Sequence, residues 1–146
     1  MEFDKDSQVR VLQVAARREE GQSFEELDEC IAHVMDMHPE FDKIWKQGEL
    51  ATHPQEINGQ VVNPFVHTVL HVIIDKQILT GQFEFVEETY LRLKDQGMED
   101  HDALHAVIAV YAELHFSSFR QGKLFDTLDY ESRLAYLSFE DADSED

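Results

Sequence analysis

The chain has 146 residues, 42% of them hydrophobic, and its formal net charge of −19 comes from 31 acidic and 12 basic residues. Ten phenylalanines against six glycines and three prolines indicate a compact globular chain of one domain and argue against disorder. So large a negative charge repels nucleic-acid phosphates and anionic membranes, which excludes both as expected partners and leaves a basic protein as the candidate partner.

The compartment follows from the cysteine count and the first residues. A single cysteine, Cys30, cannot form an internal disulfide, and the chain starts without the basic and apolar regions of a secretion signal. The longest nearly apolar stretch, residues 61–74, is interrupted by polar residues and is too short to cross a bilayer. We therefore expect a cytoplasmic protein without a membrane segment.

The first two predicted helices cover residues 7–20 and a segment that starts at Ser23. Ser23 and Glu26 have the spacing of a capping box, which predicts the start of the second helix. Apolar residues from Phe24 to Met35 then recur at helical spacing, and His38 is the next position on their stripe. We expect His38 to point toward the core and His33, on the opposite side, to face solvent.

The middle of the chain is expected to hold a short helix, a loop and a central helix. Pro39 favours a new short helix over residues 39–47, and residues 49–62, which include His53, lack periodicity and predict a loop. Asn63 and Pro64 are the residue types that begin a helix sharply, so a helix is predicted over 64–80. It is apolar around most of its circumference, apart from a polar stripe of His67, His71 and Asp75.

Three more helices are predicted over residues 82–96, 99–121 and 125–137. Glycines at positions 97 and 122 separate them. In the second of them, His101 and His105 lie at the edge of the apolar arc, whereas His115 lies inside it and is expected to be a neutral core histidine. Residues 139–146 are an acidic tail, so the predicted domain is 1–138.

These elements predict an all-α protein, a single-domain up-and-down bundle of five or six helices. In such a bundle the intervening helix returns the chain to its starting end, so both H-x-x-x-H pairs would reach the same level. His38 ends a helix antiparallel to the central one and would lie there too. Up to five imidazoles could therefore meet at one end of the core.

Histidines four residues apart on a helix are close enough to hold one ion. Neutral imidazole suits Zn, Fe, Ni or Cu, whereas Mg and Ca prefer oxygen. Asp102 and His105 only loosely imitate the E-x-x-H motif of carboxylate-bridged dinuclear sites. The sequence has no glycine-rich phosphate loop, so we expect no nucleotide cofactor. The best metal-ligand candidates are His67, His71 and His105, followed by His38 and His101.

The order of these motifs also resembles a known family. HPEF at 38–41, NPFVHTVLH at 63–71 and HDALH at 101–105 are similar to the HPEY, NPFxHxxxH and HEAEH segments of an uncharacterised bacterial helical family, domain of unknown function 1841. The resemblance places all five histidines on family positions and matches Glu113 to a downstream glutamate. Ala109 stands where that family is expected to have a glutamate, which weakens a mixed His/Glu site.

The function expected from these observations is metal binding, with Zn, Fe, Ni or Mn as the candidate ions. An open coordination position would allow the ion to activate water or bind an oxidant, and the residues favour neither reaction. One alternative is a non-catalytic interaction module with structural histidines and an acidic surface for a basic partner. Another is a structural protein that responds to pH through clustered histidines.

Overall fold

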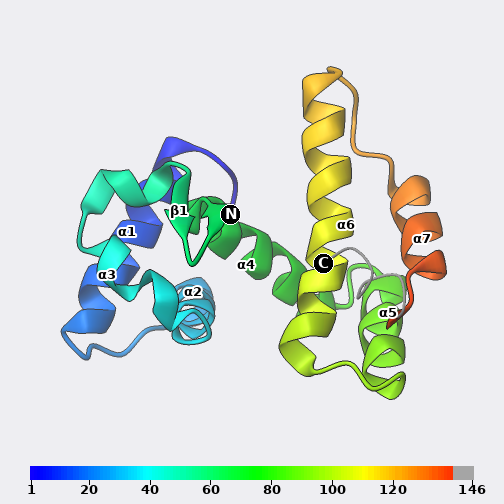
Figure 1. Ribbon diagram of the computed structural model, residues 1–146, viewed down its shortest axis with the longest axis horizontal. Coiled ribbons are helices and arrows are strands. Elements are labelled where there is room, and N and C mark those ends of the chain that lie inside the picture. Colours follow the sequence, from blue (N-terminus) through cyan, green and yellow to red (C-terminus); the bar gives the residue numbers. More distant parts are fainter. Residues whose placement is uncertain (140–146) are drawn as a thin grey trace. The chain divides into compact units, whose positions relative to one another are not determined.

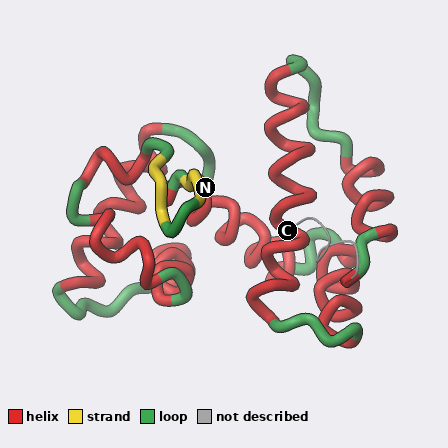
Figure 2. Tube along the Cα trace, in the orientation of Figure 1, coloured by secondary structure: helices red, strands yellow, loops and turns green. Residues whose placement is uncertain are grey.

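The computed structural model describes residues 1–139, and these residues divide into two compact units, the first over Met1–Ile73 and the second from Ile74 onward (Figure 1). The predicted acidic tail falls almost wholly outside the described residues. The fold is mostly helical, as predicted, but the described part has seven α-helices where five or six were expected, and it adds a small sheet (Figure 2). That a single domain comprises 1–138 stays a prediction.

The first unit is built from α1 (Lys5–Glu19), α2 (Glu26–Asp36), the short α3 (Asp42–Trp45), two 3₁₀ turns (Pro39–Phe41 and Gly48–Thr52) and a hairpin. Asp4 begins α1 because its carboxylate accepts a hydrogen bond from the Ser7 amide at 2.9 Å. The core lies between α1, α2, α3 and the first turns of α4 (Pro64–Thr80). Its fully buried residues include Val11, Val14, Ile31, Val34, Met35, Val69 and Val72.

The predicted capping box at Ser23 is wrong. Helix α2 begins at Glu26, and Glu25 precedes it in an extended conformation that makes no side-chain cap. The nearby Phe24 packs against the core of the first unit, and the Arg17 guanidinium lies 5.0 Å from the centre of its ring. The contacts of the partly buried Phe24 agree with an extended chain through Glu25, so tertiary packing competes here with the local capping signal.

The predicted loop over 49–62 is also wrong in part. It contains the 3₁₀ turn Gly48–Thr52 and a two-stranded antiparallel hairpin, β1 (Gln55–Ile57) and β2 (Gln60–Val62). Asn58 and Gly59 connect the strands with φ values of 52° and 83°. Two successive positive φ values are typical of the tight hairpin turn that Asn-Gly favours, and this pair was the overlooked sequence signal.

Helix α4 (Pro64–Thr80) has the predicted bounds. The Asn63 side chain caps it by accepting a hydrogen bond from the Val66 amide at 3.1 Å, and its amide group donates to the Thr52 carbonyl at 3.0 Å. Its first ten residues belong to the first unit and its last seven to the second. The cap at Asn63 fixes the start of the helix that carries His67 and His71.

The second unit consists of the end of α4 with α5 (Glu84–Asp95), α6 (Asp100–Arg120) and α7 (Thr127–Tyr136). The last three helices pack pairwise, and the chain reverses direction between them (Figure 1). Tyr130 is fully buried, and its hydroxyl donates a hydrogen bond to Gln77 Oε1 at 2.8 Å. Arg92 of α5 donates to the carbonyls of Leu134 and Leu137 at the end of α7.

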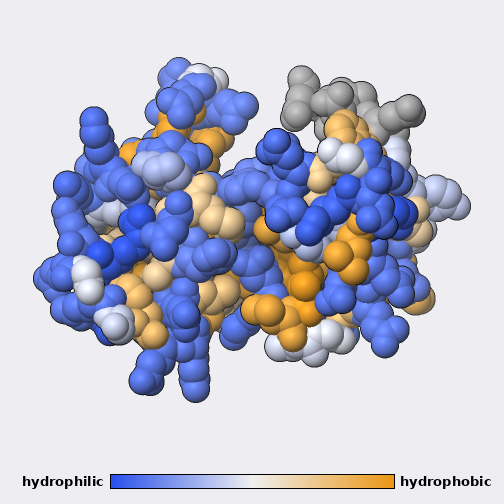
Figure 3. All heavy atoms as spheres, turned by 90° about the horizontal axis from the view of Figure 1, so that it is seen from below, coloured by the Kyte–Doolittle hydropathy of each residue, from blue (hydrophilic) through white to orange (hydrophobic). Residues whose placement is uncertain are grey.

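Figure 3 shows hydrophilic side chains over most of one face, with separate hydrophobic groups between them. Among residues 1–139, no helix combines the length and hydropathy that crossing a membrane requires.

Candidate metal centre

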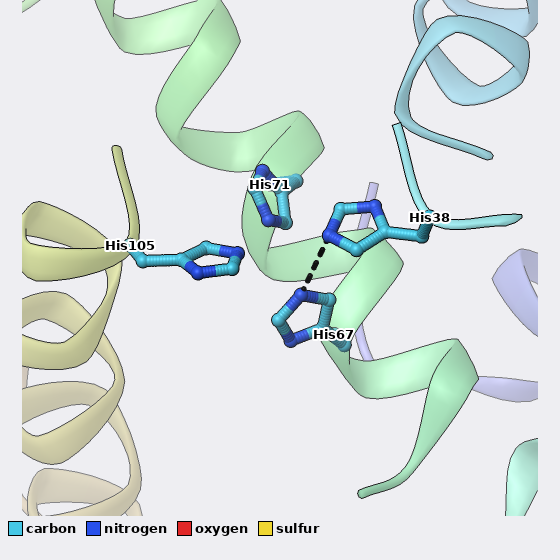
Figure 4. Close-up of side chains that lie close together, drawn as sticks. All are labelled: His38, His67, His71 and His105. Atoms are coloured by element: carbon cyan, nitrogen blue, oxygen red, sulfur yellow. Dashed lines mark hydrogen bonds between the residues drawn. The ribbon is translucent and has the colours of Figure 1, made fainter. Parts of the chain in front are cut away.

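Three of the predicted histidines meet within the first unit. His38 follows the end of α2, and His67 and His71 stand one turn apart on α4; their rings point toward one another in Figure 4. The ring centroid of His38 lies 4.6 Å from that of His67 and 4.6 Å from that of His71. Each residue offers one ring nitrogen, and these nitrogens lie within 4.8 Å of one another.

Local sequence explains how these side chains are placed. Helix α2 ends just before His38 because the following Pro39 cannot continue its hydrogen-bond ladder, and His38 leaves the helical conformation at φ −127° and ψ 63°. On α4, the cap at Asn63 starts the helix sharply, so that His67 and His71 share one face at a spacing of four residues.

One hydrogen bond determines which nitrogen of His38 is available. Nδ1 of His38 lies 2.7 Å from the carbonyl oxygen of Val34. A carbonyl can only accept, so Nδ1 carries the proton and Nε2 of the neutral ring keeps its lone pair. Metal-binding histidines usually donate from their other nitrogen to a carboxylate, a backbone carbonyl or water, which orients the ring. The Val34 carbonyl is therefore a supporting group that the sequence motifs did not reveal.

Nε2 of His38 faces Nε2 of His67 at 3.0 Å. Two nitrogens bound to one ion at about 2.0–2.1 Å stand about 3.3 Å apart at a tetrahedral angle and about 2.9 Å apart at a right angle. The observed separation lies between these values. Without an ion the same contact is a hydrogen bond from one imidazole to the other, so the geometry fits both a metal-bound and a metal-free state.

The three rings lie in a largely dry environment. His38 is 2% exposed and His71 is 0% exposed, whereas His67 is half-buried. The Phe41 ring stacks on His38 at 5.4 Å between centroids and meets His67 edge-on at 5.7 Å. Burying a charged imidazole is costly, and the neutral ring is the form that binds a metal ion. The predicted inward orientation of His38 is confirmed.

The other predicted pair lies in the second unit. His101 and His105 are half-buried on the first turns of α6, and their Nε2 atoms lie 2.8 Å apart. This repeats the arrangement of His38 and His67, in which two Nε2 atoms face each other. That all five imidazoles meet at one place stays a prediction.

The acidic residues considered as ligands stand elsewhere on α6. Asp102 is exposed, so its carboxylate stays in contact with solvent. Glu113 forms an ion pair with Arg133 at 3.3 Å, and its side chain is 70% exposed. Ala109 is exposed as well. Within α6 the candidate ligand set therefore consists of imidazoles.

Two of the remaining histidines lie on the surface as expected, whereas His115, expected in the core, is less buried than that. His33 and His53 are exposed. His115 is half-buried with its ring stacked on Tyr111 at 5.6 Å, and burial lowers the pKa of His115 from its ordinary value. Its placement agrees with a neutral histidine on an apolar face.

The comparisons with known proteins identify one family. The family model described as Domain of unknown function (DUF1841) matches residues 5–136. No curated protein and no solved structure matches the chain at a significant level.

Proposed function

Since this chain belongs to the DUF1841 family, whose description assigns no activity, we propose from the histidine geometry that it binds a divalent transition metal through His38, His67 and His71. The observation that carries the proposal is the 3.0 Å separation of the facing Nε2 atoms of His38 and His67. The hydrogen bond from His38 Nδ1 to the Val34 carbonyl sets the tautomer of His38. The histidine motif in the sequence does not by itself specify how the two rings are oriented.

His105 is our proposed fourth ligand. It belongs to the second H-x-x-x-H pair of the sequence and offers an imidazole nitrogen as the other three do. His101, whose Nε2 contacts Nε2 of His105, is the next candidate and supports the orientation of that ring. A set of nitrogen ligands favours Zn, Fe or Ni over Ca and Mg, whereas Mn, the fourth candidate ion, usually prefers oxygen ligands.

The coordination number would decide the role of the ion. Four protein ligands close a tetrahedral site and give the metal a structural role, whereas three leave a position for water or substrate. In the second case the ion would lower the pKa of the bound water or polarise a substrate oxygen. The proposed function is metal binding, and catalysis requires that open position.

The test is elemental analysis of the untagged chain purified without chelator, together with His67→Ala and His71→Ala variants. His33→Ala is the matched control, because His33 is an exposed histidine on α2. We expect near-stoichiometric metal in the unchanged chain and in the control, and little in the two variants. A metal-free chain that gains no stability from Zn, Fe, Ni or Mn would overturn the proposal and favour the interaction-module alternative.

A further inference from the structure

Phe41 contacts two of the three histidines of the first unit. Its ring is nearly parallel to that of His38, with an interplanar angle of 7° and 5.4 Å between the ring centroids. It meets the His67 ring at 87°, with the centroids 5.7 Å apart. Aromatic rings prefer these two arrangements, the offset stack and the edge-to-face contact. One side chain therefore packs against two candidate ligand rings.

The HPEF segment, residues 38–41, brings the Phe41 ring back onto His38. Pro39 starts a 3₁₀ turn, and the Phe41 amide donates a hydrogen bond to the His38 carbonyl at 3.0 Å. Side chains three residues apart in such a turn lie one above the other, which is the spacing of His38 and Phe41. The segment thus supplies a candidate ligand together with the ring that covers it.

Phe41 is itself held in place by the core of the first unit. It is 3% exposed, and the Trp45 ring meets its ring at 84° with 6.4 Å between centroids. The hydrogen bond from His38 Nδ1 to the Val34 carbonyl fixes one atom of the imidazole, but it still allows the ring to tilt about that bond. The stack on Phe41 fixes the plane of the ring as well.

The plane of an imidazole decides where its nitrogen lone pair points, because the lone pair lies in that plane. Rings that already have the binding orientation lose less conformational freedom when an ion binds, so the ion binds more tightly. The stack on His38 has a second effect. A metal-bound imidazole carries part of the positive charge of the ion, and the face of an aromatic ring attracts positive charge.

We propose that Phe41 is a positioning residue of the metal centre, whose ring fixes the planes of His38 and His67 so that their Nε2 atoms face each other at 3.0 Å. The effect of Phe41 on metal affinity rests on the proposed function. Its effect on the orientation of the rings does not, because that orientation can be measured without metal. The two proposals can therefore fail separately.

Three variants of the full chain test the role of the ring. Phe41→Leu removes the ring and keeps an apolar side chain, whereas Phe41→Tyr keeps the ring. Phe65→Leu is the matched control, because Phe65 is 2% exposed in the same core and its ring contacts none of the three histidines within residues 1–139. Circular dichroism confirms folding, and Phe41→Met replaces Phe41→Leu if the latter does not fold.

NMR of the metal-depleted chains follows the Nδ1 proton of His38, which the bond to Val34 protects. We expect a slowly exchanging signal in the unchanged chain, in Phe41→Tyr and in Phe65→Leu. In Phe41→Leu, exchange with water should be about tenfold faster or more, because exchange follows local opening. Equal exchange rates in Phe41→Leu and Phe65→Leu would overturn the proposal, whether or not the chain binds metal.

Chelator competition then compares the metal affinities of the same proteins. We expect Phe41→Leu to bind metal about 10–100-fold more weakly, the usual cost of losing a group that orients a ligand, and the other two variants to bind as the unchanged chain does. The visible absorption of the cobalt-loaded chain reports ligand geometry and should change in Phe41→Leu alone. Unchanged affinity and absorption in a folded Phe41→Leu variant would contradict the positioning role. A chain that binds no metal would overturn the proposed function, and the exchange rates would still decide the role of Phe41.

Discussion

The Nε2 atoms of His38 and His67 lie 3.0 Å apart, although 29 positions separate the two residues in the chain. The contact joins the end of α2 to the first turn of α4, two elements of the same unit. An ion at this position would bind the folded chain and not the unfolded one, because only folding brings the two rings together.

Metal should therefore stabilise the protein against heat. A ligand that binds only the folded state at about 100 times its dissociation constant adds about 2.7 kcal/mol to the free energy of unfolding. We expect a higher Tm after the metal-depleted chain is loaded with its ion, and no such rise for His38→Ala. Differential scanning calorimetry measures both. An equal rise in the variant would mean that the ion binds elsewhere.

The pair on α6 gives a second prediction. If His105 is a ligand, His105→Ala should weaken metal binding more than His101→Ala, since the latter removes a ring that we place as the next candidate or as a support. Loss of a supporting group typically costs about 10–100-fold in metal affinity. Competition titration with a chelator measures both affinities. Unchanged affinity in His105→Ala would restrict the site to the first unit.

The Asn63 cap of α4 should stabilise the folded protein. Asn63→Ala removes the acceptor for the Val66 amide and the donor to the Thr52 carbonyl, and we expect a loss of about 0.5–2 kcal/mol in the free energy of unfolding. Asn63→Asp is the matched control, because it keeps the capping oxygen and loses only the donor. Urea denaturation should rank Asp above Ala; the reverse order would mean that the bond to Thr52 matters more than the cap.

The buried hydrogen bond between Tyr130 and Gln77 should be costly to break. Tyr130→Phe leaves Gln77 Oε1 buried without its donor, and we expect a loss of about 1–3 kcal/mol in the free energy of unfolding. Adding Gln77→Met removes the stranded acceptor and should recover part of that loss. This account would be contradicted if the double variant lost more unfolding free energy than the two single variants lose together.

His115 should make stability depend on pH. Burial lowers its pKa in the folded chain below the ordinary value of 6.5, which the unfolded chain regains. Below about pH 6.5 the unfolded state then binds more protons than the folded state, so stability falls as the pH falls. The urea midpoint of the metal-depleted chain is measured between pH 5 and 7.5. It should fall less steeply with falling pH in His115→Gln than in the unchanged chain. The exposed His33→Gln should keep the original slope, and identical slopes in all three proteins would exclude the effect.

The sequence by itself determined the features that depend on neighbours in the chain. The start of α4 followed from Asn63 and Pro64, and its bounds were predicted to the residue. The inward direction of His38 followed from the apolar stripe of α2, because a helix places residues at a fixed angle. The family resemblance, carried by the same motifs, was confirmed over residues 5–136.

The tertiary structure decided what depends on residues far apart. The partly buried Phe24 packs against the core, and α2 starts at Glu26 and not at Ser23. The hairpin, by contrast, has a local signal in its Asn58–Gly59 pair, but its three-residue strands are too short to show alternation. Periodicity gives the face of a helix that carries a histidine, but not the partner that this face meets. The contact between His38 and His67 arises from packing between helices, which no local pattern encodes.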